Sequence, residues 1–112
     1  MTMLERRYEP RVEVDIALQV WGINTREENY LQQARARDVS LRGALLSGID
    51  ADLRFGDLIG VVYAGKKARF RVVWVRPSGD DHTIQAAIHR VQDDECPWPD
   101  LLPQQRGTAD SS

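Results

Sequence analysis

Apolar and polar residues alternate from position 12 to position 21, where the apolar side chains occupy every second position. This period of two is typical of a β-strand that buries one face and leaves the other in water. A second alternating stretch, 30–38, places alanines on one face and arginines on the other. The pattern therefore predicts two half-buried strands, joined by the polar connection 22–29.

Shorter segments rich in apolar residues follow, and the strands that they predict are 43–49, 57–63, 68–75 and 83–91. The run Gly65-Lys66-Lys67 looks like a hairpin turn, and 77–81 looks like another turn. No segment shows sustained helical periodicity, and turns recur at short intervals. We therefore expect an all-β fold, an antiparallel barrel or sandwich, in which a closed barrel would also remove exposed strand edges.

The composition changes after position 91, where acidic residues and prolines preclude a long regular element. Trp98, Leu101 and Leu102 are apolar, so we expect this tail to dock against the barrel with one helical turn. Residues 107–112 should be disordered. The expected divisions are an N-terminal arm at 1–11, a barrel at 12–91 and a proline-rich tail at 92–112.

Size and charge limit the classes of function. The chain has 112 residues, which is enough for one domain. Its net charge of −2 is a poor match to sequence-independent DNA or RNA binding, which usually needs a wide basic face. The single cysteine, Cys96, excludes an intramolecular disulfide and fits a reducing cytosol. No apolar run approaches the roughly 20 residues of a membrane span. We expect a cytoplasmic protein without membrane insertion.

Two short motifs carry the candidate chemistry. The first is R-x-x-x-R preceded by a further arginine, and the second is D-x-S-x-x-G; their residues are Arg6, Arg7 and Arg11, then Asp38, Ser40 and Gly43. A guanidinium fork matches phosphate oxygens or the O6/N7 edge of guanine, and its plane can stack on a base. A carboxylate accepts from the N1–H and N2–H donors of guanine, and glycine lets a flat ligand approach the backbone. The set suits a ligand with both phosphates and guanine edges.

From about Arg6 to about Val91 the chain resembles the PilZ domain, a small bacterial β-barrel family that binds the second messenger cyclic di-GMP. The likeness lies in the two motifs, in the rhythm of strands, in the Gly56-Asp57 turn and in the run Arg71-Val72-Val73-Trp74. The last strand departs from the family, whose members often have a glycine and a phenylalanine there. Many members lack the arginine motif and do not bind the nucleotide, but this chain has it. The resemblance implies a six-stranded PilZ-type barrel with a flexible N-terminal arm.

By this resemblance the protein is a cyclic di-GMP receptor that signals through a conformational change and acts on a downstream protein partner. Arg7 and Arg11 would clamp phosphate and guanine groups, and Arg6 would add a third donor and a stacking plane. Asp38 would accept from a guanine edge, and Ser40 would bond to phosphate or guanine. In the family, a basic residue at the position of Arg6 tends to accompany an intercalated ligand dimer, which implies two ligands per chain.

The remaining site candidates are Gly43, which would give a flat ligand clearance, Arg42 inside the loop motif, and Trp74 as an aromatic wall. Each has a plainer interpretation. The arginines can be the solvated start of a strand, Asp, Ser and Gly favour local turns, and Trp74 can be a core or rim aromatic.

Catalysis finds little support in the sequence. His82, His89 and Cys96 share no metal-ligand spacing, and there is no nucleophile elbow or glycine-rich phosphate loop. We therefore predict neither an enzyme nor a bound cofactor or metal. Two alternatives to the receptor stay open: a PilZ-like scaffold that recognises a protein without binding nucleotide, and a small RNA-binding barrel.

Overall fold

The computed structural model describes residues 11–23, 27–79 and 82–102. The expected flexible arm, apart from Arg11, and the expected disordered end at 107–112 lie outside these residues. The strands are β1 (Val12–Ile23), β2 (Asn29–Val39), β3 (Gly43–Ile49), β4 (Leu58–Tyr63), β5 (Lys66–Pro77) and β6 (Ile84–Arg90). A short 3-10 turn, η2 (Pro99–Leu101), follows in the tail.

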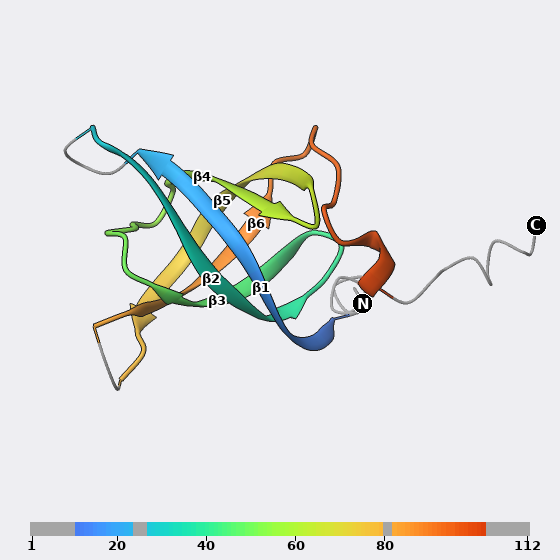
Figure 1. The fold of residues 1–112 in the computed structure, drawn as a ribbon, viewed down its shortest axis with the longest axis horizontal. Coiled ribbons are helices and arrows are strands. Elements are labelled where there is room, and N and C mark those ends of the chain that lie inside the picture. The colour runs from blue at the N-terminus through green and yellow to red at the C-terminus, as the bar shows by residue number, and fades with distance from the viewer. Residues whose placement is uncertain (1–10, 24–26, 80–81, 103–112) are drawn as a thin grey trace, which may run out of the picture.

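The strands form a closed antiparallel barrel in the order β1-β2-β3-β6-β5-β4. Pairing of β1 with β4 closes the ring, and pairing of β3 with β6 joins its two halves (Figure 1). The predicted six-stranded barrel is confirmed. The described part of the chain contains no helix long and apolar enough to cross a membrane.

The core follows from the alternation. On β1 and β2 the inward positions are partly or fully buried and alternate with exposed ones, and Leu18, Val20, Ala34 and Ala36 are all at most 3 % exposed. Small alanines on β2, β3, β5 and β6 leave room inside the barrel for larger groups. The predicted inward faces of both strands are therefore confirmed.

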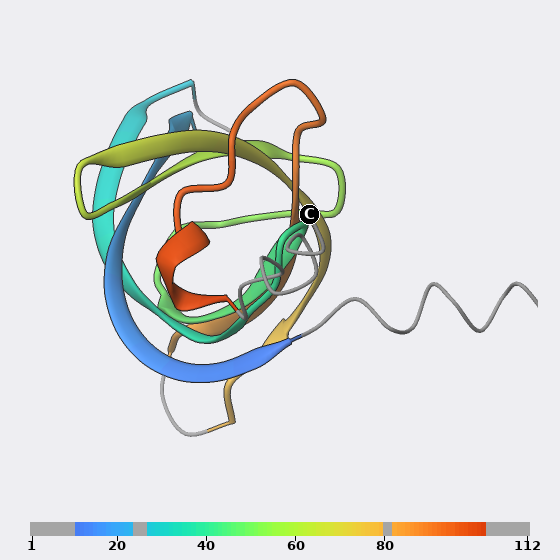
Figure 2. The same ribbon diagram turned by 90° about the vertical axis from the view of Figure 1, so that its right-hand side faces the viewer.

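The C-terminal tail closes one end of the barrel. Trp98 is only 1 % exposed, and its ring lies 5.5 Å from that of Phe70, measured between centroids, at a tilt of 34°. Viewed along the barrel, the tail and η2 lie across the opening of the ring of strands (Figure 2). Burying an aromatic side chain of this size stabilises a fold by about 2–3 kcal/mol. The expected docking of the tail through Trp98 is thus observed.

The β4–β5 hairpin differs from the prediction. Its two-residue loop is Ala64-Gly65, both with positive φ (51° and 82°), and Tyr63 pairs with Lys66 directly beside it. Positive φ at both central residues gives the backbone twist that matches two antiparallel strands. Lys66 and its neighbour Lys67 consequently belong to β5 and not to the turn. The strand is longer than the predicted 68–75 at both ends.

Asp94 fastens the start of the tail to β5. The Nε and Nη2 atoms of Arg69 donate to its two carboxylate oxygens at 3.0 and 2.9 Å, and the Arg69 backbone N–H donates at 2.7 Å. A guanidinium fork on a carboxylate is a charge-assisted arrangement, stronger than neutral hydrogen bonds. Through these bonds, Arg69 lowers the pKa of Asp94 from 3.8 to about 2.

This pKa predicts a pH-dependent stability. Because the folded pKa of Asp94 lies below its ordinary value, the stabilisation is complete above about pH 4 and is lost as the pH falls toward 2. Asp94→Asn should therefore lower the melting temperature at pH 7, and the gap to the wild type should narrow between pH 4 and pH 2. Asp93→Asn, at the exposed neighbouring position, is the control. A gap that is independent of pH would contradict the role of the carboxylate charge.

Candidate functional site

The predicted motifs meet where β1 begins and β2 ends. Val12 pairs with Val39 and Glu13 with Asp38, so the end of the first motif, at Arg11, lies beside the start of the second, at Asp38. The Nη2 atom of Arg11 lies 3.3 Å from Oδ1 of Asp38, although the residues are 27 positions apart in sequence. The Arg11 side chain is 66 % exposed and the Asp38 side chain 23 %. An exposed ion pair of this kind contributes about 0–1 kcal/mol, so a ligand can displace it at little cost.

Asp38 faces outward because β2 contains a bulge. Against β3, Ala36 pairs with Leu46 and Asp38 with Leu45, which leaves Arg37 as the additional residue. The bulge turns both Arg37 and Asp38 toward the surface while Ala36 stays buried. Without the additional residue, strict alternation would make Asp38 and Ala36 share the inward face.

Ser40 shapes the loop between β2 and β3 from within. Its Oγ accepts the backbone N–H groups of Arg42 at 3.3 Å and Gly43 at 3.1 Å, and its own N–H donates to the Gly43 carbonyl at 2.9 Å. The residue is only 8 % exposed. A serine hydroxyl has two acceptor lone pairs, and both are used here. This geometry gives Ser40 a role in holding the loop, and its predicted contact with phosphate or guanine stays a prediction.

The structure also explains why position 43 is a glycine. A Cβ at this position would lie 2.3 Å from the carbonyl oxygen of Ile88 and 3.1 Å from Cδ2 of His89. β3 and β6 therefore approach so closely that only glycine fits between them. This contact explains the glycine without a ligand, and the predicted clearance for a flat ligand at Gly43 stays a prediction.

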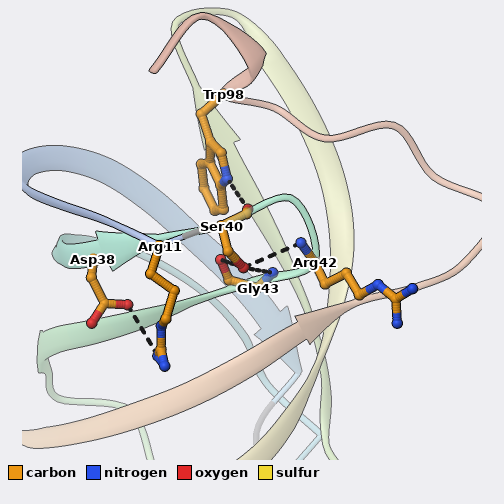
Figure 3. A network of polar contacts seen from close by, with 6 residues as sticks. All are labelled: Arg11, Asp38, Ser40, Arg42, Gly43 and Trp98. Atoms are coloured by element: carbon orange, nitrogen blue, oxygen red, sulfur yellow. Dashed lines mark hydrogen bonds and ion pairs between the residues drawn. The ribbon is translucent and has the colours of Figure 1, made fainter. Parts of the chain in front are cut away.

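Trp98 supports the loop from the core side. Its indole Nε1–H donates to the backbone carbonyl of Ser40 at 2.8 Å (Figure 3). The sequence indicates a packing role for Trp98 but not this bond. The available signal was general: a buried tryptophan almost always has a partner for its N–H. The tail and the D-x-S-x-x-G loop are therefore one connected unit.

Asp38 and Trp74 stand at the two ends of one row across the outer surface. Asp38 pairs with Leu45, Leu45 with Ala87 and Ala87 with Trp74, so the row crosses β2, β3, β6 and β5. At a strand spacing near 4.8 Å the row is roughly 14 Å wide. Trp74 is 36 % exposed, and the guanidinium carbon of Arg76 lies 4.5 Å from its ring centroid. The two middle residues are apolar and make a low floor.

A groove of about 420 Å³ lies beside Asp38 on this surface, and the side chains that line it are Glu13, Val14, Arg37, Asp38, Leu45 and Gln85. Arg42, by contrast, extends away from the Arg11–Asp38 pair (Figure 3). Two of the predicted arginines, Arg6 and Arg7, lie outside the described residues. The structure thus brings Arg11 and Asp38 together and aligns Asp38 with Trp74.

Comparison of the chain with protein-family models, with curated proteins and with solved structures finds no match. Within residues 11–23, 27–79 and 82–102, no group of three or more His, Cys, Asp or Glu side chains could hold a metal ion.

The bond between Trp98 and Ser40 can be tested by Trp98→Phe. Phenylalanine keeps an aromatic ring beside Phe70 but leaves the buried Ser40 carbonyl without its donor. The free energy of unfolding, measured with urea, should fall by about 1–3 kcal/mol for the lost bond, with a further cost for the smaller ring. Trp74→Phe, the same change at an exposed tryptophan, should cost about 1 kcal/mol or less. If the free energy of unfolding fell equally in the two variants, the hydrogen bond from the Trp98 indole N–H would contribute nothing to stability.

Proposed function

We propose that this protein is a receptor for cyclic di-GMP that binds the dinucleotide on the outer surface of the barrel between Arg11, Asp38 and Trp74. The observation that carries the proposal is the Arg11–Asp38 pair, in which distant parts of two motifs resembling those of PilZ domains lie 3.3 Å apart. A forked cation and a carboxylate side by side can recognise the phosphate and the guanine edge of one ligand.

Binding is an exchange of partners. A ligand phosphate takes the place of the Asp38 carboxylate at the guanidinium of Arg11, and Asp38 then accepts from the N1–H and N2–H of guanine. Hydrogen bonds to charged groups contribute about 1.5–3 kcal/mol each, whereas the exposed ion pair that they replace contributes about 0–1 kcal/mol. Both Arg11 and Asp38 therefore gain more from the ligand than they lose when their ion pair breaks.

The groove and the row supply the remaining contacts. The groove beside Asp38 has a volume of about 420 Å³, which falls in the range of small-molecule sites. The indole ring of Trp74 offers a flat surface for a base, and stacking of this kind contributes about 1–3 kcal/mol. Leu45 and Ala87, which lie between Asp38 and Trp74 in the row, are apolar and can contact the flat face of a base.

The arm would complete the clamp. Arg7 would add a second guanidinium at the phosphates, and Arg6 a third that stacks between the bases of two ligand molecules. Closure of the arm over the barrel would change the surface presented to a protein partner, which is the proposed output. This part of the proposal rests on the resemblance, since both residues lie outside the described part of the chain.

Calorimetric titration with cyclic di-GMP tests the proposal, and Arg11→Ala is the first variant. The loss of its charge-assisted bonds should weaken binding by about 1.5–3 kcal/mol, which is tenfold or more, while the melting temperature of the free protein stays near that of the wild type. Arg35→Ala, which removes an exposed arginine paired with Asp15 on the same strands, should bind as the wild type does. If the wild-type protein gives no binding isotherm, the receptor function is refuted and the scaffold and RNA-binding alternatives remain.

Asp38→Ala tests whether the Asp38 carboxylate recognises the guanine base. Adenine lacks the N1–H and N2–H donors, so only guanine gains from the Asp38 carboxylate. The variant should bind cyclic di-GMP more weakly and should lose much of the preference for it over cyclic di-AMP in a competition assay. An unchanged preference would remove Asp38 from base recognition, even if Arg11 proved essential.

A further inference from the structure

A second hollow, of about 360 Å³, lies at the end of β6, and the side chains that line it are Arg42, His89, Arg90 and Gln92. All of these are polar, two are guanidinium groups, and none is a carboxylate. Of these residues, only Arg42 belongs to the predicted ligand site. In the close-up view, Arg42 points away from Arg11 and Asp38 (Figure 3).

Arg90 gives the hollow a fixed positive charge. Its Nε donates to the Leu41 carbonyl at 3.1 Å and its Nη1 to the Asp94 carbonyl, and its backbone N–H donates to the Arg42 carbonyl at 2.6 Å. Carbonyl oxygens carry no net charge, so these bonds orient the guanidinium without neutralising it. The nearby carboxylate of Asp94 is itself held by Arg69. Arg90 therefore lines the hollow with a guanidinium whose hydrogen bonds to Leu41 and Asp94 are made to carbonyl oxygens.

The hollow lies close to the surface proposed for the dinucleotide, because β3 contributes to both. Gly43 pairs with His89, which lines the hollow, and Leu45, two residues further along β3, lines the groove beside Asp38. Two residues of a strand span about 7 Å.

We propose that this hollow is a second anion site, which binds the phosphate group of a phosphate ester. Two guanidinium groups, an imidazole and an amide surround the space, and such a set offers several donors to the three or four oxygens of one phosphate. A carboxylate, with two oxygens, would use fewer of them. The ester is either a second cyclic di-GMP stacked beside the first, in which case the inference rests on the proposed function, or a separate nucleotide.

The first experiment uses inorganic phosphate as the probe, and so does not depend on the proposed function. In ¹⁵N–¹H NMR spectra at constant ionic strength, phosphate should shift the amide signals of Arg42 and of 89–92 saturably, while chloride should not. Arg42→Glu should weaken this binding about tenfold or more, since it replaces an attractive charge by a repulsive one. Arg54→Glu, a charge reversal at an exposed arginine in the β3–β4 connection, should leave it unchanged. Absence of saturable shifts, or equal weakening by both variants, would overturn the anion site.

Arg42 lies in loop 40–43, so Arg42→Glu can weaken phosphate binding simply by disturbing the loop. Gln92→Glu is the variant that separates this effect from the change of charge. Gln92 is exposed and follows β6, so a carboxylate there should repel phosphate without altering the bonds of Ser40. If Gln92→Glu binds phosphate as tightly as the wild type, the hollow is not the site.

Titration with cyclic di-GMP separates the two sources of the phosphate. If the second molecule of a stacked pair occupies the hollow, Arg42→Glu should reduce the stoichiometry from two ligands to one and leave the remaining binding intact. If the ester is a separate nucleotide, the stoichiometry of cyclic di-GMP should not change, and 5′-GMP should compete with inorganic phosphate for the hollow. A protein that binds phosphate here but no cyclic di-GMP would refute the receptor function and leave the anion site standing.

Discussion

The indole of Trp98 is the contact on which both the core and the candidate site depend. It fills the open end of the barrel beside Phe70 and donates its N–H to the Ser40 carbonyl at 2.8 Å. Ser40 in turn accepts the N–H groups of Arg42 and Gly43. A buried carbonyl without a donor costs about 1–3 kcal/mol, so the docked tail stabilises this shape of the loop. Asp94, held by Arg69, keeps it docked.

Bulges decide what the outer surface offers. A closed barrel of alternating strands would put every second residue outside, but the register shifts between Ala36 and Asp38 and between Val72 and Trp74 each add a residue. These shifts bring Asp38 and Trp74 to the surface in the same row, with Leu45 and Ala87 between them. The chemistry of the surface is therefore a consequence of irregularities in the sheet.

The sequence predicted the barrel well because a period of two determines which face of each strand is buried, as Leu18 and Val20 show. It predicted the hairpin turn at Gly65 less well, because the left-handed conformation of Ala64 leaves no mark in a residue pattern. A motif shows which residues occur together but not which neighbours they contact, so the sequence could not reveal the bonds of Ser40 within the loop or the close approach of Gly43 to Ile88. The bond of Trp98 to the loop, across 58 positions, could be seen only in three dimensions.

The parts of the site differ in how far they are prepared for a ligand. Loop 40–43 is held by the hydroxyl of Ser40 from within and by the indole N–H of Trp98 from the core side. The guanidinium of Arg90 is held by hydrogen bonds to the Leu41 and Asp94 carbonyls. These groups lose little freedom when a ligand arrives. Arg11, with its side chain 66 % exposed, loses more, and ordering such a side chain costs about 0.5–1.5 kcal/mol. Its contact with Asp38 reduces that cost, because the guanidinium already lies within 3.3 Å of the carboxylate that a ligand would displace. A weak ion pair in the free protein thus serves binding by holding the arginine near its place of action, and a stronger one would oppose the exchange.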